Sequence, residues 1–145
     1  MASSAMARRP VVFDLVVDSS AVMSILLGEA TAGLVRDELA LAQAPAISAA
    51  SVMEASMVAR ARAGERGSEI VGRVLGDSGI TTLPVDSHQL ALARDVWGRF
   101  GKGRHRAALN FGDCFSYALA RHLGVALLAV GDDFVHTDLR VVPTT

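Results

Sequence analysis

The chain has 145 residues, of which 51% are apolar and 20% are charged, and its 14 basic and 15 acidic side chains give a formal net charge of -1. This is close to the commonest size of a single domain, and the high apolar fraction with balanced charge excludes a disordered chain. Because Cys114 is the only cysteine, an intramolecular disulfide and a multi-cysteine zinc site are excluded, which favours a reducing compartment.

The ends and apolar runs of the chain indicate where the protein resides. The longest apolar runs, such as Val125–Val130, are far shorter than the roughly 20 residues that cross a bilayer. The first ten residues include Arg8 and Arg9 but lack the apolar core of a signal peptide. We therefore expect a soluble cytoplasmic protein with no membrane contact, consisting of an N-terminal extension at residues 1–14 and one domain at residues 15–145.

Hydrophobic periodicity and capping residues divide the domain into alternating strands and helices. Three N-terminal helix signals stand out: Ser51 with Glu54, Asp86 with Gln89, and Asn110 with Asp113, each pair three residues apart. In the first half of the chain the patterns predict a strand at 15–17, a helix ending at Gly28, a helix at about 31–41, a strand at 46–48, a helix from near Ser51 to Gly64 and a helix at about 68–75. In the second half they predict a strand at 80–85, a helix from Asp86 to Phe100, a basic loop at 101–108, a helix from Asn110 to Gly124, a strand at 126–130 and a last strand at 140–142.

Strands separated by helices predict an α/β fold with a central, mostly parallel sheet flanked by helices. The run at 126–130 is apolar at every position, as expected of a parallel strand covered on both faces. In such sheets ligands bind at the carboxyl ends of the strands. Asp18 and the pair Asp132 and Asp133 follow predicted strands directly, so they are expected at that edge.

Four acidic positions therefore become candidates for one pocket: Asp18 and Asp133 (or Asp132) after strands, and Glu54 and Asp113 in the first turns of helices. Crowded carboxylates repel one another unless a cation neutralises them. Ligation by oxygen alone suits Mg²⁺ or Mn²⁺, and such an ion activates water for attack on a phosphodiester. Helix N-termini are expected to favour the ionised carboxylates of Glu54 and Asp113.

Each of these residues also has a purely structural interpretation. Glu54 and Asp113 fit the third helical position, where they would satisfy backbone donors, and Asp18 fits a helix N-cap. Asp132 and Asp133 follow Gly131 and fit a turn. Spacing alone leaves the structural and the functional interpretations open.

Several segments of the chain resemble PIN-domain ribonucleases of the VapC toxin family. They are the run Val16–Ala21, the helix of Glu54, the stretch Gly101–Ala120 and the run Gly131–Phe134. The likeness covers residues 15–142, and its most specific part is the stretch Gly101–Ala120 with the Gly-Asp-Asp-Phe run behind it. Relatives commonly begin almost at the first strand, so the N-terminal extension is a departure from the pattern.

The resemblance implies a Rossmann-like PIN fold, a Mg²⁺- or Mn²⁺-dependent endoribonuclease, a VapB-like antitoxin that neutralises it, and a homodimer. It implies an RNA substrate, with tRNA or another structured RNA among the candidates. Carried over by position, the metal ligands and catalytic residues are Asp18, Glu54, Asp113 and Asp133, with Asp132 as the alternative for the last. Ser19 or Ser20 is expected to position a metal-bound water.

The basic loop at 101–108 is the candidate RNA contact. Lys102, Arg104 and Arg106 are expected to hold phosphates, while a solvated basic surface is the competing interpretation. Cys114 is expected in the core, and Trp97 and Phe100 in the core or a dimer surface. The apolar helices at 21–27 and 34–41 are expected either to complete the core or to leave a groove for a partner.

Three other functions compete with the toxin. A housekeeping PIN nuclease would lack an antitoxin, and an inactive PIN module would serve only as a binding scaffold. A phospho-acceptor signalling domain with Asp18 as acceptor needs a lysine beside the acidic pocket. The only lysine is Lys102, in the basic loop, which argues against that design.

Overall fold

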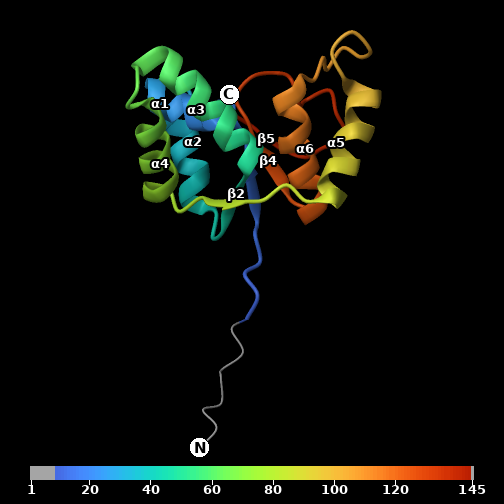
Figure 1. The fold of residues 1–145 in the computed structure, drawn as a ribbon. Helices are drawn as coiled ribbons and strands as arrows, with labels where there is room; N and C mark the ends of the chain where they lie inside the picture. Colours follow the sequence, from blue (N-terminus) through green and yellow to red (C-terminus); the bar gives the residue numbers. More distant parts are fainter. Residues whose placement is uncertain (1–8, 145) are drawn as a thin grey trace, which may run out of the picture.

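A parallel five-stranded sheet with the strand order β3-β2-β1-β4-β5 organises the molecule, whose computed structural model describes residues 9–144 (Figure 1). The elements are β1 (Leu15–Val17), α1 (Ser19–Leu27), α2 (Ala32–Leu41), β2 (Pro45–Ser48), α3 (Ala49–Ala63), α4 (Gly67–Asp77), β3 (Thr81–Leu83), α5 (Ser87–Phe100), α6 (Phe111–Leu123), β4 (Ala126–Leu128) and β5 (Val141–Val142). The predicted α/β class and parallel sheet are confirmed.

The strands send alternate side chains into two separate hydrophobic layers. Leu15 and Val17 of β1 pack with buried residues of α1 to α4, whereas Val16 packs with residues of α5 and α6. In β4, Leu128 joins the first layer and Leu127 the second. Both faces of the sheet are therefore covered, which explains why β1 and β4 are apolar at every position.

The order in which strands are added to the sheet changes side at β1. From β1 the chain adds β2 and β3 on one side, then returns to add β4 and β5 on the other. Beyond β1 lies Asp18, whose backbone N–H donates to the carbonyl of Leu128 at the end of β4 (2.9 Å). Crevices at such switch points are where open α/β sheets bind ligands.

Most predicted elements are present, but several strands are shorter than expected. Strands predicted at 80–85 and 126–130 are Thr81–Leu83 and Ala126–Leu128. Pro84 lacks a backbone N–H, which helps to end β3 early. The helix predicted at about 68–75 extends over Gly67–Asp77.

The capping box predicted at Ser51 and Glu54 is wrong. Ser48, the last residue of β2, is the N-cap of α3, and its hydroxyl accepts the N–H of Ala50 (3.3 Å). With no loop between strand and helix, α3 starts at Ala49, and Ser51 is a buried residue within its first turn. Glu54 consequently lies in the second turn, beyond the reach of the charge at the helix N-terminus.

The predicted N-terminal extension falls partly outside the described residues, which begin at residue 9. Its last residue, Asp14, accepts the backbone N–H groups of Gln43 (2.8 Å) and Ala44 (2.9 Å), and this fixes the chain as it enters β1. Within residues 9–144, no helix combines the length and apolar character needed to span a membrane.

Candidate active site

Asp18 lies at the switch point, 3% exposed, as the N-cap of α1. Its Oδ2 accepts the N–H of Ser20 (3.0 Å), and its Oδ1 accepts the hydroxyl of Ser116 (2.5 Å). The structural and the functional interpretations thus apply to the same side chain: Asp18 caps a helix while presenting a carboxylate at the carboxyl end of the central strand.

Asp113 occupies the first turn of α6 in the predicted capping box, which is confirmed. Its Oδ2 accepts the N–H of Asn110 (3.0 Å), and its own N–H donates to the side-chain oxygen of Asn110 (2.9 Å). The residue is 6% exposed. The cap fixes the carboxylate at the edge of α6 that approaches α3.

Glu54, in the second turn of α3, lies between α1 and α6. Its Oε1 accepts the hydroxyl of Ser19 in α1 (2.5 Å). On the other side, its carboxylate lies so close to the backbone of Gly112 that a Cβ on this glycine would overlap it. Gly112 thus leaves room for the Glu54 carboxylate beside Asp113, and the hydrogen bond from Ser19 holds it near Asp18.

The fourth carboxylate comes from the segment after β4. Asp132 and Asp133 are both exposed, and the pKa of Asp133 is raised by burial and by the negative charges of Asp18 and Asp132. Asp133 also acts on Asp113, as described next. Of the two candidates, Asp133 is thus the one whose charge is felt at the other carboxylates.

Electrostatic crowding is strongest at Asp113. Burial raises the pKa of its carboxyl group to about 7; the hydrogen bond from Asn110 opposes this rise, and the charges of Asp18, Asp133 and Glu54 add to it. The other three predicted acidic residues therefore all lie within electrostatic range of Asp113. Where several carboxylates lie this close together, a bound cation reduces the repulsion between their negative charges.

The donor chemistry of this pocket fits a hard divalent cation, since it consists of carboxylates with serine hydroxyls beside them. Within residues 9–144, no group of three or more His, Cys, Asp or Glu side chains is arranged so that it could hold an ion by itself. Mg²⁺ commonly takes only one or two protein carboxylates and completes its shell with water and substrate phosphate oxygens. The arrangement is compatible with that mode and not with a closed protein cage.

Two serines missed by sequence reasoning complete the pocket. Ser116 bridges Asp18 and the hydroxyl of Ser51 (3.0 Å), and both serines are fully buried. The signal was present, since Ser116 follows Asp113 by three residues and so shares its helix face. Of the two serines expected to position water, Ser19 bonds Glu54, whereas Ser20 accepts the N–H of Val130 (3.0 Å) and joins α1 to the end of β4.

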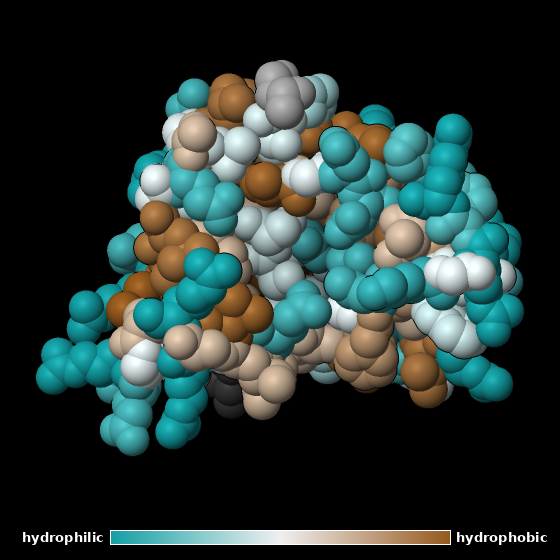
Figure 2. All heavy atoms as spheres, turned by 90° about the horizontal axis from the view of Figure 1, so that it is seen from above, coloured by the Kyte–Doolittle hydropathy of each residue, from teal (hydrophilic) through white to brown (hydrophobic). Residues whose placement is uncertain are grey.

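The basic loop, residues 101–108, leads directly into α6 and exposes Lys102, Arg104 and Arg106. The backbone N–H of Lys102 donates to the carbonyl of Leu109 (2.9 Å), and the N–H of Leu109 donates to the carbonyl of Phe100 (2.9 Å), which anchors the loop. The guanidinium of Arg104 lies 4.2 Å from the centre of the Trp97 ring. The loop, orange in Figure 1, lies at the end of the molecule to which the strands point. Figure 2 views this face and shows hydrophilic side chains gathered on the side of α5 and the loop.

Other side chains singled out by sequence reasoning lie away from this chemistry. Cys114 is buried as predicted, and burial raises the pKa of its thiol to about 11, so it is a core residue and not a nucleophile. Trp97 is partly exposed, while Phe100 packs against the core layer of α5 and α6.

Sequence comparison identifies the family. Residues 15–139 match the PIN domain model. A ribonuclease VapC of Mycolicibacterium smegmatis is 41% identical over 128 residues, which cover 88% of this chain and 99% of that protein. Ribonuclease VapC36 of Mycobacterium tuberculosis is 43% identical over 126 residues, covering 86% and 91%.

Solved structures share the fold at low sequence identity. The VapC20 toxin of Mycobacterium tuberculosis, described as cleaving the sarcin-ricin loop, has a TM-score of 0.73 at 18% identity and covers 89% of this chain and 98% of its own. A toxin-antitoxin complex from Klebsiella pneumoniae has a TM-score of 0.68 at 14% identity, covering 91% and 98%. The chain therefore belongs to the VapC family of PIN-domain proteins.

Proposed function

We propose that this chain is the toxin of a type II toxin-antitoxin pair and cleaves RNA as a divalent-metal-dependent endoribonuclease. The observation that carries the proposal is the crowding at the switch point, where burial and the charges of three other carboxylates raise the pKa of Asp113. The names of relatives at 41% and 43% identity, both ribonucleases, support the same activity.

Of Asp18, Glu54, Asp113 and Asp133, one or two would contact Mg²⁺ or Mn²⁺ directly, and the others would hold it through bound water. When bound, such an ion supplies charge stabilisation for the scissile phosphodiester and a nucleophile from water at neutral pH. The protein's own contribution is positional: the Asn110 cap fixes Asp113, and the hydroxyls of Ser116 and Ser19 fix Asp18 and Glu54. The three exposed cations of the basic loop would hold phosphates on either side of the cleaved bond.

The decisive experiment is an RNA cleavage assay on purified protein with Mg²⁺, with Mn²⁺ and with EDTA. We expect cleavage with either ion and none with EDTA, and we expect Asp113→Asn to abolish it. Asp86→Asn is the matched control, because Asp86 is also an aspartate at a helix N-terminus, accepting the N–H of Gln89 (2.8 Å) outside the pocket. Cleavage that persists in EDTA or in Asp113→Asn would refute the proposal.

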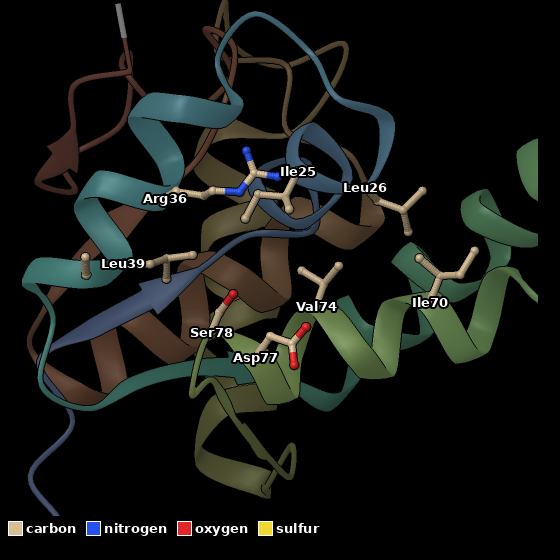
Figure 3. A pocket seen from close by; sticks show the side chains of 9 residues that line it. Ile25, Leu26, Arg36, Leu39, Ile70, Val74, Asp77 and Ser78 are labelled. Atoms are coloured by element: carbon tan, nitrogen blue, oxygen red, sulfur yellow. The ribbon is translucent and has the colours of Figure 1, made fainter.

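A groove between α1, α2 and α4 is the proposed docking site of the antitoxin. Its volume is about 570 Å³, and Figure 3 shows its apolar side chains with Arg36 and Asp77 among them. Its occupant is inferred from the structural neighbour that is a toxin-antitoxin complex. An amphipathic helix fits such a groove, since apolar anchors would meet Ile25, Leu39 and Val74.

The docking site can be tested by co-expression with the antitoxin, which we expect a small open reading frame beside the gene to encode. Val74→Asp is expected to abolish co-purification and leave RNA cleavage intact, whereas Glu69→Gln, on the first turn of the same helix but not among the groove residues, should leave both unchanged. Unaltered co-purification of Val74→Asp would place the antitoxin elsewhere.

A homodimer is also part of the proposal, with apolar side chains of α3, α5 and α6 as its interface. Phe111 is 79% exposed, and two hollows of about 380 and 330 Å³ meet at Phe111 and Phe115. Exposed apolar surface of this kind favours a protein contact. Light scattering should give twice the chain mass, and Phe111→Ser should reduce it to that of a monomer; a monomeric wild type would contradict this part.

The signalling alternative has less support. Both oxygens of Asp18 already accept hydrogen bonds and the side chain is buried, so it is a poor acceptor for a phosphoryl group. Lys102 is the only lysine of the chain and belongs to the exposed loop.

A further inference from the structure

The segment between β4 and β5, residues 131–139, has neither helix nor strand although it carries Asp133. Its shape therefore depends on side-chain anchors. One anchor is Phe134, which is 3% exposed and packs in the core layer of α5 and α6. A short turn follows, in which the hydroxyl of Thr137 donates to the carbonyl of Phe134 (2.6 Å).

The second anchor is Asp138, whose carboxylate is held by three side chains from two helices. The hydroxyl of Tyr117 donates to Oδ1 (2.5 Å), while Arg121 (3.0 Å) and Arg99 (3.3 Å) donate to Oδ2. Arg99 also donates to the hydroxyl of Tyr117 (3.1 Å), which closes the network. We call these four residues the Asp138 clamp.

The clamp connects the segment to the helix of Asp113. Tyr117 follows Asp113 by one helical turn on α6 and is 1% exposed, so its ring moves only with that helix. Asp138 follows Asp133 by five residues, a short tether. The clamp therefore joins, through side chains, the helix of Asp113 and the segment of Asp133, between which no backbone hydrogen bond is found in the described residues.

We propose that the Asp138 clamp is a positioning device that holds Asp133 against Asp18 and Asp113, and that Tyr117, Asp138 and Arg99 are positioning residues for the metal pocket. The proposal rests on the proposed function, since it gives the segment a role in the same pocket.

The chemistry of the clamp suits this role better than that of an incidental surface contact. Burial acts to raise the pKa of Asp138, but the bonds from Tyr117 and Arg99 keep it below its ordinary value, so the group stays charged throughout the neutral range. Hydrogen bonds with a charged partner are roughly twice as strong as neutral ones. Outer-shell groups of this kind orient metal ligands, and losing one commonly lowers metal affinity by about 10–100-fold.

The test compares Tyr117→Phe and Asp138→Asn with the matched control Asp95→Asn. Asp95 also binds Arg99 (3.0 Å) but lies on α5 and does not contact the segment. Mn²⁺ affinity is measured by calorimetry, amide hydrogen exchange is followed for residues 131–137, and RNA cleavage is resolved into kcat and KM. Circular dichroism selects a temperature at which every variant is folded.

We expect both clamp variants to bind Mn²⁺ about tenfold more weakly and to lose about tenfold in kcat, with KM for RNA within about twofold, because the basic loop is untouched. Exchange should accelerate at residues 131–137 and not within α6. The control should match wild type in all three measurements. The double variant should be no worse than either single one, since both changes break the same contact.

Two results would overturn the clamp: Mn²⁺ affinity and exchange equal to those of wild type in both clamp variants, or an equal loss in Asp95→Asn. A wild type that neither binds Mn²⁺ nor cleaves RNA would instead reject the proposed function. In that case exchange at residues 131–137 alone decides whether the clamp holds the segment, and unchanged exchange rejects it as well.

Discussion

Asp113→Asn should stabilise the metal-free protein above neutral pH while it destroys activity. The reason is that the pKa of Asp113 is raised from 3.8 to about 7. A carboxyl group whose pKa is higher in the folded state contributes stability below its unfolded pKa, near 4, and loses that contribution as the pH rises through about 7. At pH 8 the wild type therefore carries an ionised carboxylate that asparagine lacks.

The size of the effect follows from the same shift. About three pKa units correspond to roughly 4 kcal/mol at 1.36 kcal/mol per unit, which is an upper bound. Solvent near the pocket screens these charges, so we expect about 1–2 kcal/mol, or a rise in Tm of about 3–6 °C for a domain of this size. Asparagine retains a side-chain oxygen for the N–H of Asn110, so the cap is not lost.

Thermal unfolding in EDTA between pH 4 and pH 8.5 provides the measurement. The advantage of Asp113→Asn should vanish near pH 4 and grow toward pH 8, whereas the control Asp86→Asn should show no such growth. Added Mg²⁺ should raise the Tm of wild type more than that of the variant. A variant that is less stable than wild type at pH 8 in EDTA, or a difference independent of pH, would show that burial and the neighbouring charges do not raise the pKa of Asp113.

Three further outcomes follow from the contacts of the pocket. Gly112→Ala should reduce cleavage at least about tenfold, because the new Cβ must displace the Glu54 carboxylate; full activity would mean that Glu54 can move without cost. Ser116→Ala should lower the free energy of unfolding, measured by urea titration, by about 1–3 kcal/mol, because it removes a buried hydroxyl that donates to Asp18. An unchanged unfolding midpoint would argue against the hydrogen bond between Ser116 and Asp18. Replacing Lys102, Arg104 and Arg106 by alanine in the inactive Asp113→Asn protein should weaken RNA binding, measured by fluorescence anisotropy. The slope of log K for binding against log salt concentration should fall by about 2, and an unchanged slope would exclude phosphate contacts in the basic loop.

The fold was predictable from sequence because the hydrophobic pattern of the strands and the residues that end the helices indicate the same elements. Apolar runs as short as three residues define the strands of a sheet covered on both faces, and glycines such as Gly28 and Gly124 end helices in the left-handed conformation. The ends of β3 and β4 were less predictable. A strand ends where its neighbour stops pairing, and that neighbour is distant in sequence.

The candidate site was predictable to the extent that it depends on strand ends and helix starts. Asp18 and Asp113 were found because each residue both caps a helix and lies at the sheet edge. Glu54 lies beside the other candidate carboxylates as expected, but its predicted helix register was wrong, since Ser48 and Ser51 are equally good caps in sequence and only the end of β2 decides between them. The contact between Tyr117 and Asp138 left no local signal, because the two residues are 21 positions apart and a complete strand lies between them.

The central place of β1 has a consequence for the order in which the protein can form during translation. β1 pairs with β2 early in the chain, but its other neighbour, β4, begins at Ala126. Until the ribosome has delivered that strand, β1 has an open edge, and Asp18 lacks the Leu128 carbonyl that accepts its N–H. Chains that stop before β4 should therefore be unable to assemble the pocket, which can form only once Leu128 has emerged from the ribosome.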